Sequence, residues 1–235
     1  PTLWRKPQSK RSSSREVNEL MMKKQIHYLE MHDSNDGMKI FNAGTRYDFY
    51  IIENCPIYKK TIINGEDRKN VEVDLRSYNF IPNYNLPLFD KLITKQNEIE
   101  KCPIIFNRTN YGSDKEWVSD TKDNVYTHTL IHSTPKSGIR YKYSSRNDKG
   151  HFGISKVIFG ESGINDVIID MNGDYGMTQG SMAIEVSNIE EARKIKSILL
   201  SDKFTDFLKT VSWSNFRIDW RLFTYIKRDF WKEFI

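Results

Sequence analysis

The stretch from Lys136 to Phe159 contains the residues best suited to bind an anion. It holds six Lys and Arg residues against one acid, Asp148, so its net charge (6 − 1 = +5) equals the formal charge of the whole chain. Within it, Arg140, Lys142 and Ser144 alternate with apolar and aromatic residues, which predicts a strand with one solvated face. Basic side chains interleaved with aromatics suit a phosphate backbone with exposed bases. The same pattern is also typical of an ordinary solvated strand face with surface lysines.

Other reactive residue types are present without the spacing that a catalytic or metal site needs. His27 and His32 are five residues apart, and His128 and His132 are four apart in a segment that reads as a strand; neither pair has an obvious third ligand. The carboxylates show no Glu-x-Lys grouping of the nuclease type. Gly-x-Ser-x-Gly, phosphate-loop and dinucleotide-binding patterns are all missing. The sequence therefore predicts no catalytic residues and no metal ligands.

Composition limits the class of protein. The 235 residues include 38% hydrophobic and 13% aromatic residues, enough for one large or two small cores, and the sequence pI near 9.0 permits a polyanionic partner. The only cysteines, Cys55 and Cys102, are far apart, which predicts free thiols in a reducing compartment. No apolar run approaches the roughly 18 residues of a membrane helix. We expect a cytoplasmic protein with no membrane partner.

The pattern of predicted helices and strands changes near residue 60. A helix is predicted over about 13–24, strands over 26–31 and 45–53, and a turn over 33–37. This order, with nearly continuous apolar strands, is typical of part of a three-layer α/β sheet.

Residues 61–235 look like a mixture of hairpins and helices. Hairpins are predicted over 61–73, closed by Asn64-Gly65, and over 167–178, closed by Asn172-Gly173. A short helix is predicted to open at Pro87. Apolar spacing predicts an amphipathic helix over 189–200 and a second helix capped by Ser201. The predicted class is thus α/β over 1–60 followed by α+β over 61–235.

Several segments together resemble the C-terminal part of adenine-N6 DNA methyltransferases of the restriction–modification type. FNAGTRYDFYIIEN (41–54) is similar to the loop and long strand that follow the catalytic half of these enzymes. The preceding LWRKPQS…ELMMKKQIHYLEMHD is similar to the loop, helix and strand that follow their catalytic Asn-Pro-Pro-Tyr/Phe motif. KVIFGESGINDVIID…YGMTQGSMAIEV and EEARKIKSILLSDKFTDFL resemble the target-recognition domain of the same enzymes. The likeness covers most of the chain and is weakest over 61–125.

The resemblance implies that the two parts of the chain have different roles. Residues 1–60 would be the last strands of a Rossmann-like methyltransferase sheet, and 61–235 a mixed hairpin and helix recognition domain for double-stranded DNA. The sequence departs from the family in lacking both the glycine motif for S-adenosylmethionine and the catalytic Asn-Pro-Pro-Tyr/Phe motif. The cofactor would therefore belong to the parent enzyme, and this chain would not methylate without a catalytic half on the same or a separate chain.

The resemblance also suggests roles for individual residues. An adenine must leave the duplex before its N6 can react, and Phe41 is the candidate to stack on it; its other interpretation is an anchor for the loop. Candidates that read base edges are Arg140, Lys142, Arg146, Asn147, Lys149 and Gln179. Candidates that hold phosphates are Lys6, Lys10 and Arg11.

Two other hypotheses remain open at this point. The chain could be a specificity or interaction subunit that works with a separate catalytic chain. It could also be a nuclease with an unrecognised metal site, which would cleave plasmid DNA in the presence of Mg²⁺.

Overall fold

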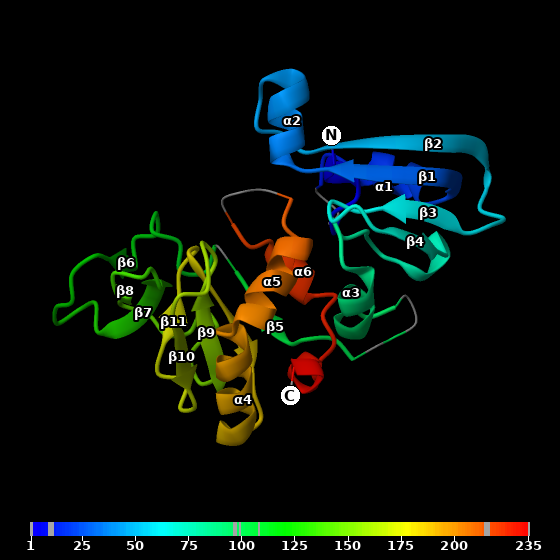
Figure 1. Cartoon of the computed structure of the whole chain (residues 1–235). Coiled ribbons are helices and arrows are strands. Elements are labelled where there is room, and N and C mark those ends of the chain that lie inside the picture. The colour runs from blue at the N-terminus through cyan, green and yellow to red at the C-terminus, as the bar shows by residue number, and fades with distance from the viewer. Residues whose placement is uncertain are drawn as a thin grey trace. The chain divides into compact units, whose positions relative to one another are not determined.

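The computed structural model of the chain forms two compact units (Figure 1). It describes residues 2–8, 12–95, 98, 100–107, 109–213 and 217–234. The first unit combines Pro1–Glu100 with Phe207–Asn215, and the second combines Lys101–Asp206 with Phe216–Ile235. The chain is a mixed α/β protein with three small sheets, which confirms the predicted class at that coarse level.

The first unit has one four-stranded sheet with the order β2-β1-β3-β4 (Figure 1). Strand β1 pairs antiparallel with β2 and parallel with β3, so the sheet is mixed. Its strands are β1 (Lys24–His32), β2 (Tyr47–Pro56), β3 (Thr61–Asn64) and β4 (Asn70–Val73). Its helices are η1 (Thr2–Trp4), α1 (Arg15–Met21), α2 (Ser34–Phe41), η2 (Leu75–Ser77) and α3 (Leu86–Leu92).

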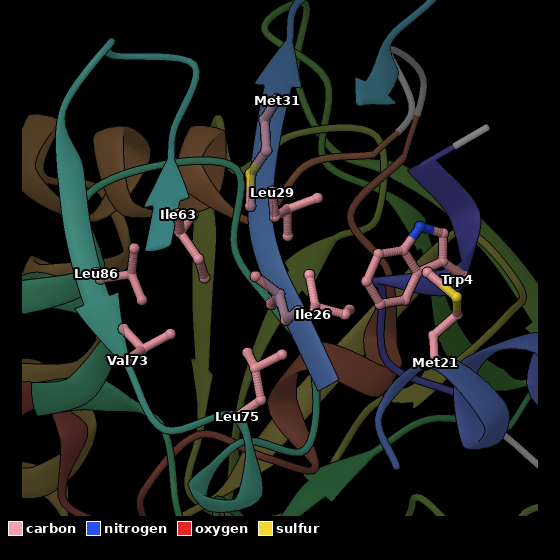
Figure 2. Packing of buried hydrophobic residues seen from close by; sticks show 10 residues of the cluster. Trp4, Met21, Ile26, Leu29, Met31, Ile63, Val73, Leu75 and Leu86 are labelled. Atoms are coloured by element: carbon pink, nitrogen blue, oxygen red, sulfur yellow. The ribbon is translucent and has the colours of Figure 1, made fainter. Parts of the chain in front are cut away.

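The core of this unit is built around β1. Figure 2 shows Ile26, Leu29 and Met31 along that strand, in a buried cluster that also contains Trp4 and Ile63. Ile26 and Leu29 are three residues apart, yet both are fully buried. A register shift between residues 26 and 28 explains this, because a bulge inserts one extra residue and resets the alternation of the strand.

A buried arginine joins distant segments of the same unit. The Arg5 guanidinium is fully buried; its Nε donates to Asp48 Oδ2 on β2 at 2.9 Å. Its Nη1 donates to the carbonyl of Pro82 and to Asn83 Oδ1, both at 3.2 Å. These bonds fix the N-terminal segment against β2 and against the chain before α3.

The second unit has two four-stranded sheets, with the orders β10-β9-β12-β5 and β11-β7-β8-β6. The strands are β5 (Ile104–Ile105), β6 (Val118–Ser119), β7 (His128–Ser133), β8 (Arg140–Ser144), β9 (Lys156–Gly160), β10 (Val167–Asp170), β11 (Gly176–Met177) and β12 (Ser181–Glu185). The helices are α4 (Ile189–Leu199), α6 (Trp220–Phe223) and η3 (Phe230–Phe234). Helix α5 (Asp202–Thr210) crosses the division between the units.

Several predicted elements are confirmed. Helix α4 buries Ala192, Ile195 and Leu199 on one face, as their spacing predicts, and Asn188 caps its first turn. Ser201 Oγ accepts from the backbone N–H of Phe204 at the start of α5. The hairpin β3–β4 also forms, although its loop extends to residue 69.

The turn predicted over residues 33–37 is wrong, because this segment begins helix α2. The Asp33 carboxylate accepts from the backbone N–H groups of Asn35 (2.8 Å) and Asp36 (2.9 Å), which is the bonding of an N-cap. The cap compensates for the weak helix propensity of the Ser-Asn-Asp-Gly sequence.

The hairpin predicted over 167–178 is also wrong. Strand β10 pairs with β9, whereas β11 lies in the other sheet and pairs parallel with β7, so the chain changes sheet at Asn172-Gly173. Likewise β8 and β9 belong to different sheets and do not form a hairpin across residues 145–155. Asn-Gly predicted a tight change of direction but not which sheet the next strand would join.

The division between the units differs from the boundary drawn near residue 60. Strand β3 pairs with β1 immediately beyond that point, so residues on both sides share one sheet. The functional assignments given to 1–60 and 61–235 remain predictions.

A buried ion pair lies where the chain of the second unit changes sheet. Lys156 Nζ donates to Asp170 Oδ2 at 2.6 Å, and both side chains are almost completely buried. The Asp170 carboxylate also accepts from the backbone N–H groups of Asp174 (2.8 Å) and Tyr175 (3.0 Å). One side chain thus neutralises the lysine and holds the turn that leads to β11.

Among the helices formed by the described residues, none has both the length and the apolar character that crossing a membrane requires.

We predict that Lys156→Met destabilises the second unit by about 3–5 kcal/mol, because it leaves the Asp170 carboxylate buried without its cation. Urea unfolding followed by circular dichroism would measure the change. The control is Lys203→Met on the exposed side of α5, which we expect to alter stability by no more than about 0.5 kcal/mol. Equal effects of the two substitutions would contradict the prediction.

Candidate nucleic-acid interface

Two loops of the second unit are bonded together beside β8. Trp117 Nε1 donates to the carbonyl of Asn110 at 3.0 Å, and Asn110 Nδ2 donates to the carbonyl of Lys149. The backbone N–H of Lys149 in turn donates to the buried Tyr111 hydroxyl at 3.1 Å. The loop over 109–119 and the loop over 145–151 therefore form one ordered surface.

Trp117 is the centre of this surface. Its indole ring lies 5.4 Å from Lys149 Nζ and 6.0 Å from Arg146 Cζ, within the range of cation–π attraction. Arg146 Nε and Nη2 also donate to the Asp148 carboxylate at 2.9 and 2.7 Å. We call Trp117, Arg146, Asp148 and Lys149 the cation–indole cluster.

The cluster unites two of the predicted base-reading residues, Arg146 and Lys149, with Asn147 exposed between them. Arg140 is exposed as well, but it begins β8 whereas Arg146 follows its end. Four residue steps at ~3.3 Å separate the two ends of that strand by ~13 Å. Arg140 is therefore outside the cluster.

The other two candidates in this unit are engaged in internal contacts. Lys142 forms an ion pair with Asp120, and only 14% of its side chain is exposed. Gln179 uses both ends of its amide on Ser113: Nε2 donates to the hydroxyl at 3.0 Å and Oε1 accepts from the backbone N–H at 3.1 Å. Gln179 thus anchors the 109–119 loop, a role that its sequence position did not suggest.

The remaining candidates belong to the first unit. Lys6 is half-buried, and Lys10 and Arg11 lie outside the described residues. Phe41 ends helix α2 rather than lying in a loop, and its side chain is 55% exposed. Its ring is almost perpendicular to that of Tyr47, with the two ring centroids 5.1 Å apart. Tyr47 in turn stacks on His32, with almost parallel rings and centroids 4.3 Å apart. Phe41 is therefore held from one side and open on another.

The outer strand of the first sheet is apolar and uncovered. Phe49, Tyr50, Ile51 and Ile52 are consecutive on β2, so they point alternately to both faces of the sheet, yet each is at least 39% exposed. In the part of the chain that the structure describes, β1 is the only strand that pairs with β2. An edge of ten residues with this composition is typical of a surface that pairs with another polypeptide.

His132 is held by an internal contact. His132 Nδ1 contacts Thr178 Oγ1 at 2.7 Å, and burial lowers the pKa of His132. Within the described residues, no group of three or more His, Cys, Asp or Glu side chains gathers as a metal site would require.

His151 anchors the loop over 145–151 from inside the protein. Its backbone is in the left-handed region (φ 77°), its side chain is buried, and its Nδ1 accepts from the backbone N–H of Met177 at 3.2 Å. Burial, reinforced by the Lys156 ammonium, lowers the pKa of His151 from 6.5 to about 4. The imidazole is therefore neutral at pH 7 and acts as an acceptor.

The sequence predicted a loop over 113–124 but not the part that Trp117 and its neighbours play in the candidate site. A tryptophan within the polar run SDKEWVSD was the available signal, because a large aromatic in such a loop needs a structural or binding partner. Nothing in the sequence connects it to residues 146–149, which are about thirty positions away.

We predict that the stability of the second unit falls as the pH drops from about 6.5 to 4. In that window the unfolded chain binds a proton at His151 that the folded state does not, so acid favours unfolding by roughly 3 kcal/mol in total. His151→Asn keeps an acceptor and tolerates the left-handed backbone, and it should flatten the profile in urea titrations. His27→Gln, on β1 in the first unit, is the control; an unchanged slope in His151→Asn would contradict the prediction.

Comparison with known proteins adds no assignment to this geometry. No protein-family model matches the chain, and a search of curated proteins finds no match, so the likeness to adenine methyltransferases stays a prediction.

Proposed function

We propose that this chain is the DNA-recognising part of an S-adenosylmethionine-dependent adenine-N6 DNA methyltransferase of the restriction–modification type. It binds double-stranded DNA and does not methylate alone. The cofactor and the catalytic residues belong to a catalytic half, carried on the same chain or on a separate one.

The observation that carries the proposal is the cation–indole cluster. Arg146 is an exposed cation and Lys149 a half-buried one, both on an ordered aromatic surface, with the exposed amide of Asn147 between them. Cations attract the phosphate backbone, whereas planar and amide groups can bond to base edges in the major groove. An ordered surface of this kind suits a duplex, whose groove has a fixed shape.

Phe41 gives independent support for the methyltransferase assignment. A base extruded from a duplex is held by stacking on apolar or aromatic side chains. Phe41 is exposed at the end of α2 and is backed by Tyr47, so one side of its ring is available for such a base. The alternative role of Phe41, which is to anchor the loop to the core, fits less well because more than half of this residue is exposed.

The uncovered strand β2 supports the requirement for a catalytic half. A strand from that half would extend the sheet by hydrogen bonding along β2, and its side chains would lie beside those of Phe49 and Ile51 on one face and of Tyr50 and Ile52 on the other. The same feature favours the alternative function, a specificity or interaction subunit that works with a separate catalytic chain. The two differ in whether the catalytic motifs are encoded in the same reading frame.

We predict that the chain binds random-sequence duplex DNA with an affinity that falls steeply with salt, because phosphate binding releases counterions. Fluorescence anisotropy across a salt series would measure it. Arg146→Glu combined with Lys149→Glu should weaken binding at least tenfold at low salt and reduce the slope.

The matched control is Arg193→Glu combined with Lys203→Glu, which changes net charge by the same amount on exposed helix positions away from the loops. Equal losses in the two double variants would mean that the interface is misplaced. No binding by the wild-type chain at low salt would contradict the proposed function for the isolated chain.

We further predict that the isolated chain self-associates with increasing concentration through β2. Ile51→Lys should suppress this, because a charge on an edge strand disfavours pairing with another strand. Sedimentation velocity and binding of a hydrophobic dye would follow the effect. Val125→Lys, at an exposed apolar position of the second unit, is the control. A wild-type chain that stays monomeric and binds no dye would argue against β2 as a docking edge.

A further inference from the structure

Arg146 is constrained more tightly than an ordinary surface arginine. The Asp148 carboxylate accepts from Nε and Nη2, which fixes one edge of the guanidinium plane. The indole of Trp117 lies 6.0 Å from Cζ. The backbone N–H of Arg146 donates to Ser144 Oγ at 3.0 Å, and the backbone N–H of Ser145 donates to the carbonyl of Trp117 at 3.0 Å. Both the side chain and its loop are therefore pre-positioned.

The adjacent edge of the guanidinium, formed by Nη1 and the second N–H of Nη2, remains available. Within the described residues Nη1 has no hydrogen-bond partner, and 47% of the side chain is exposed. This edge presents parallel N–H donors in one plane. Because the carboxylate holds the other edge, little conformational freedom is lost when a ligand with two adjacent acceptors binds.

Charge separates the role of Arg146 from that of its neighbour. Asp148 offsets the charge of Arg146, so this pair contributes little to attraction for a polyanion. Lys149 has no carboxylate partner in the described part of the chain and approaches the same indole as a compact point charge. Lys149 thus suits a phosphate, which needs charge, whereas Arg146 suits a ligand recognised by geometry.

Guanine is the base that matches this donor edge. Its major-groove edge carries two acceptors, O6 and N7, whereas adenine offers one acceptor and one donor there, and cytosine a donor. We propose that Arg146 reads a guanine in the recognised DNA sequence, with Asp148 and Trp117 as positioning residues and Lys149 on an adjacent phosphate. The inference rests on the proposed function and names one base that the interface selects.

Selection of binding sites from a randomised duplex pool by the full chain tests the proposal. Wild-type protein should enrich sites with an invariant guanine, and replacing that guanine should weaken binding roughly tenfold or more. Arg146→Lys keeps the charge and should lose this preference, so that sites with and without the guanine bind it with equal affinity. Lys149→Gln should do the reverse, lowering affinity for all sequences and retaining the guanine.

The positioning residues need a measurement that a purely structural role would not affect. Asp148→Asn should weaken the guanine preference with no loss of affinity for random duplex, because the guanidinium loses its clamp. Trp117→Phe should retain the preference through its remaining ring, and Trp117→Leu should weaken it. Thermal unfolding of each variant confirms that the fold is intact before the sites are compared.

The results that would overturn the inference differ from those that would overturn the function. Duplex binding with no enriched guanine, or a guanine preference that survives Arg146→Lys, removes the role of Arg146 and leaves DNA recognition standing. A wild-type chain that binds no duplex at low salt removes both.

Discussion

The ion pair between Lys156 and Asp170 is the constraint on which the architecture of the second unit depends. It joins β9 to β10 inside the protein, where an unpaired charge would be strongly unfavourable. Because Asp170 also bonds to the backbone of residues 174 and 175, the pair determines where the chain leaves one sheet and enters the other. Gly173 passes so close to Gly153 that a Cβ atom there would lie 2.4 Å from a backbone nitrogen. The turn that the buried ion pair holds therefore lies against the backbone at Gly153, in the loop after β8.

The formal charge of the basic stretch overstates its attraction for a polyanion. Lys156 is buried against Asp170, Lys142 is paired with Asp120, and Arg146 is paired with Asp148. Asp148 is already counted within the stretch, but Asp120 and Asp170 come from other segments, which a count along the stretch does not detect. The proposed interface consequently depends on geometry more than on net charge, in contrast to the general electrostatic attraction that composition suggests.

Local signals in the sequence predicted individual elements well. The 3.6-residue spacing of Ala192, Ile195 and Leu199 was sufficient for α4, and the β-branched and aromatic run was sufficient for β2. The failures have both local and tertiary causes. Helix α2 depends on the Asp33 cap and on Gly37, where a Cβ would collide with the carbonyl of Thr45. For the candidate site, the sequence indicated Arg146 and Lys149, but Trp117 joins them only through contacts between loops that are distant in the chain.

The first unit is assembled from segments that are made at very different times. The backbone N–H of Asn83 donates to the carbonyl of Thr210, and its side-chain amide donates to the carbonyl of Ser212, both at 2.7 Å. During vectorial synthesis on the ribosome, the β1–β4 sheet therefore emerges long before the segment that completes its unit, while nearly all of the second unit is translated in between. The nascent first sheet, with its uncovered β2, must therefore wait until residues 101–206 have been translated before its unit is complete.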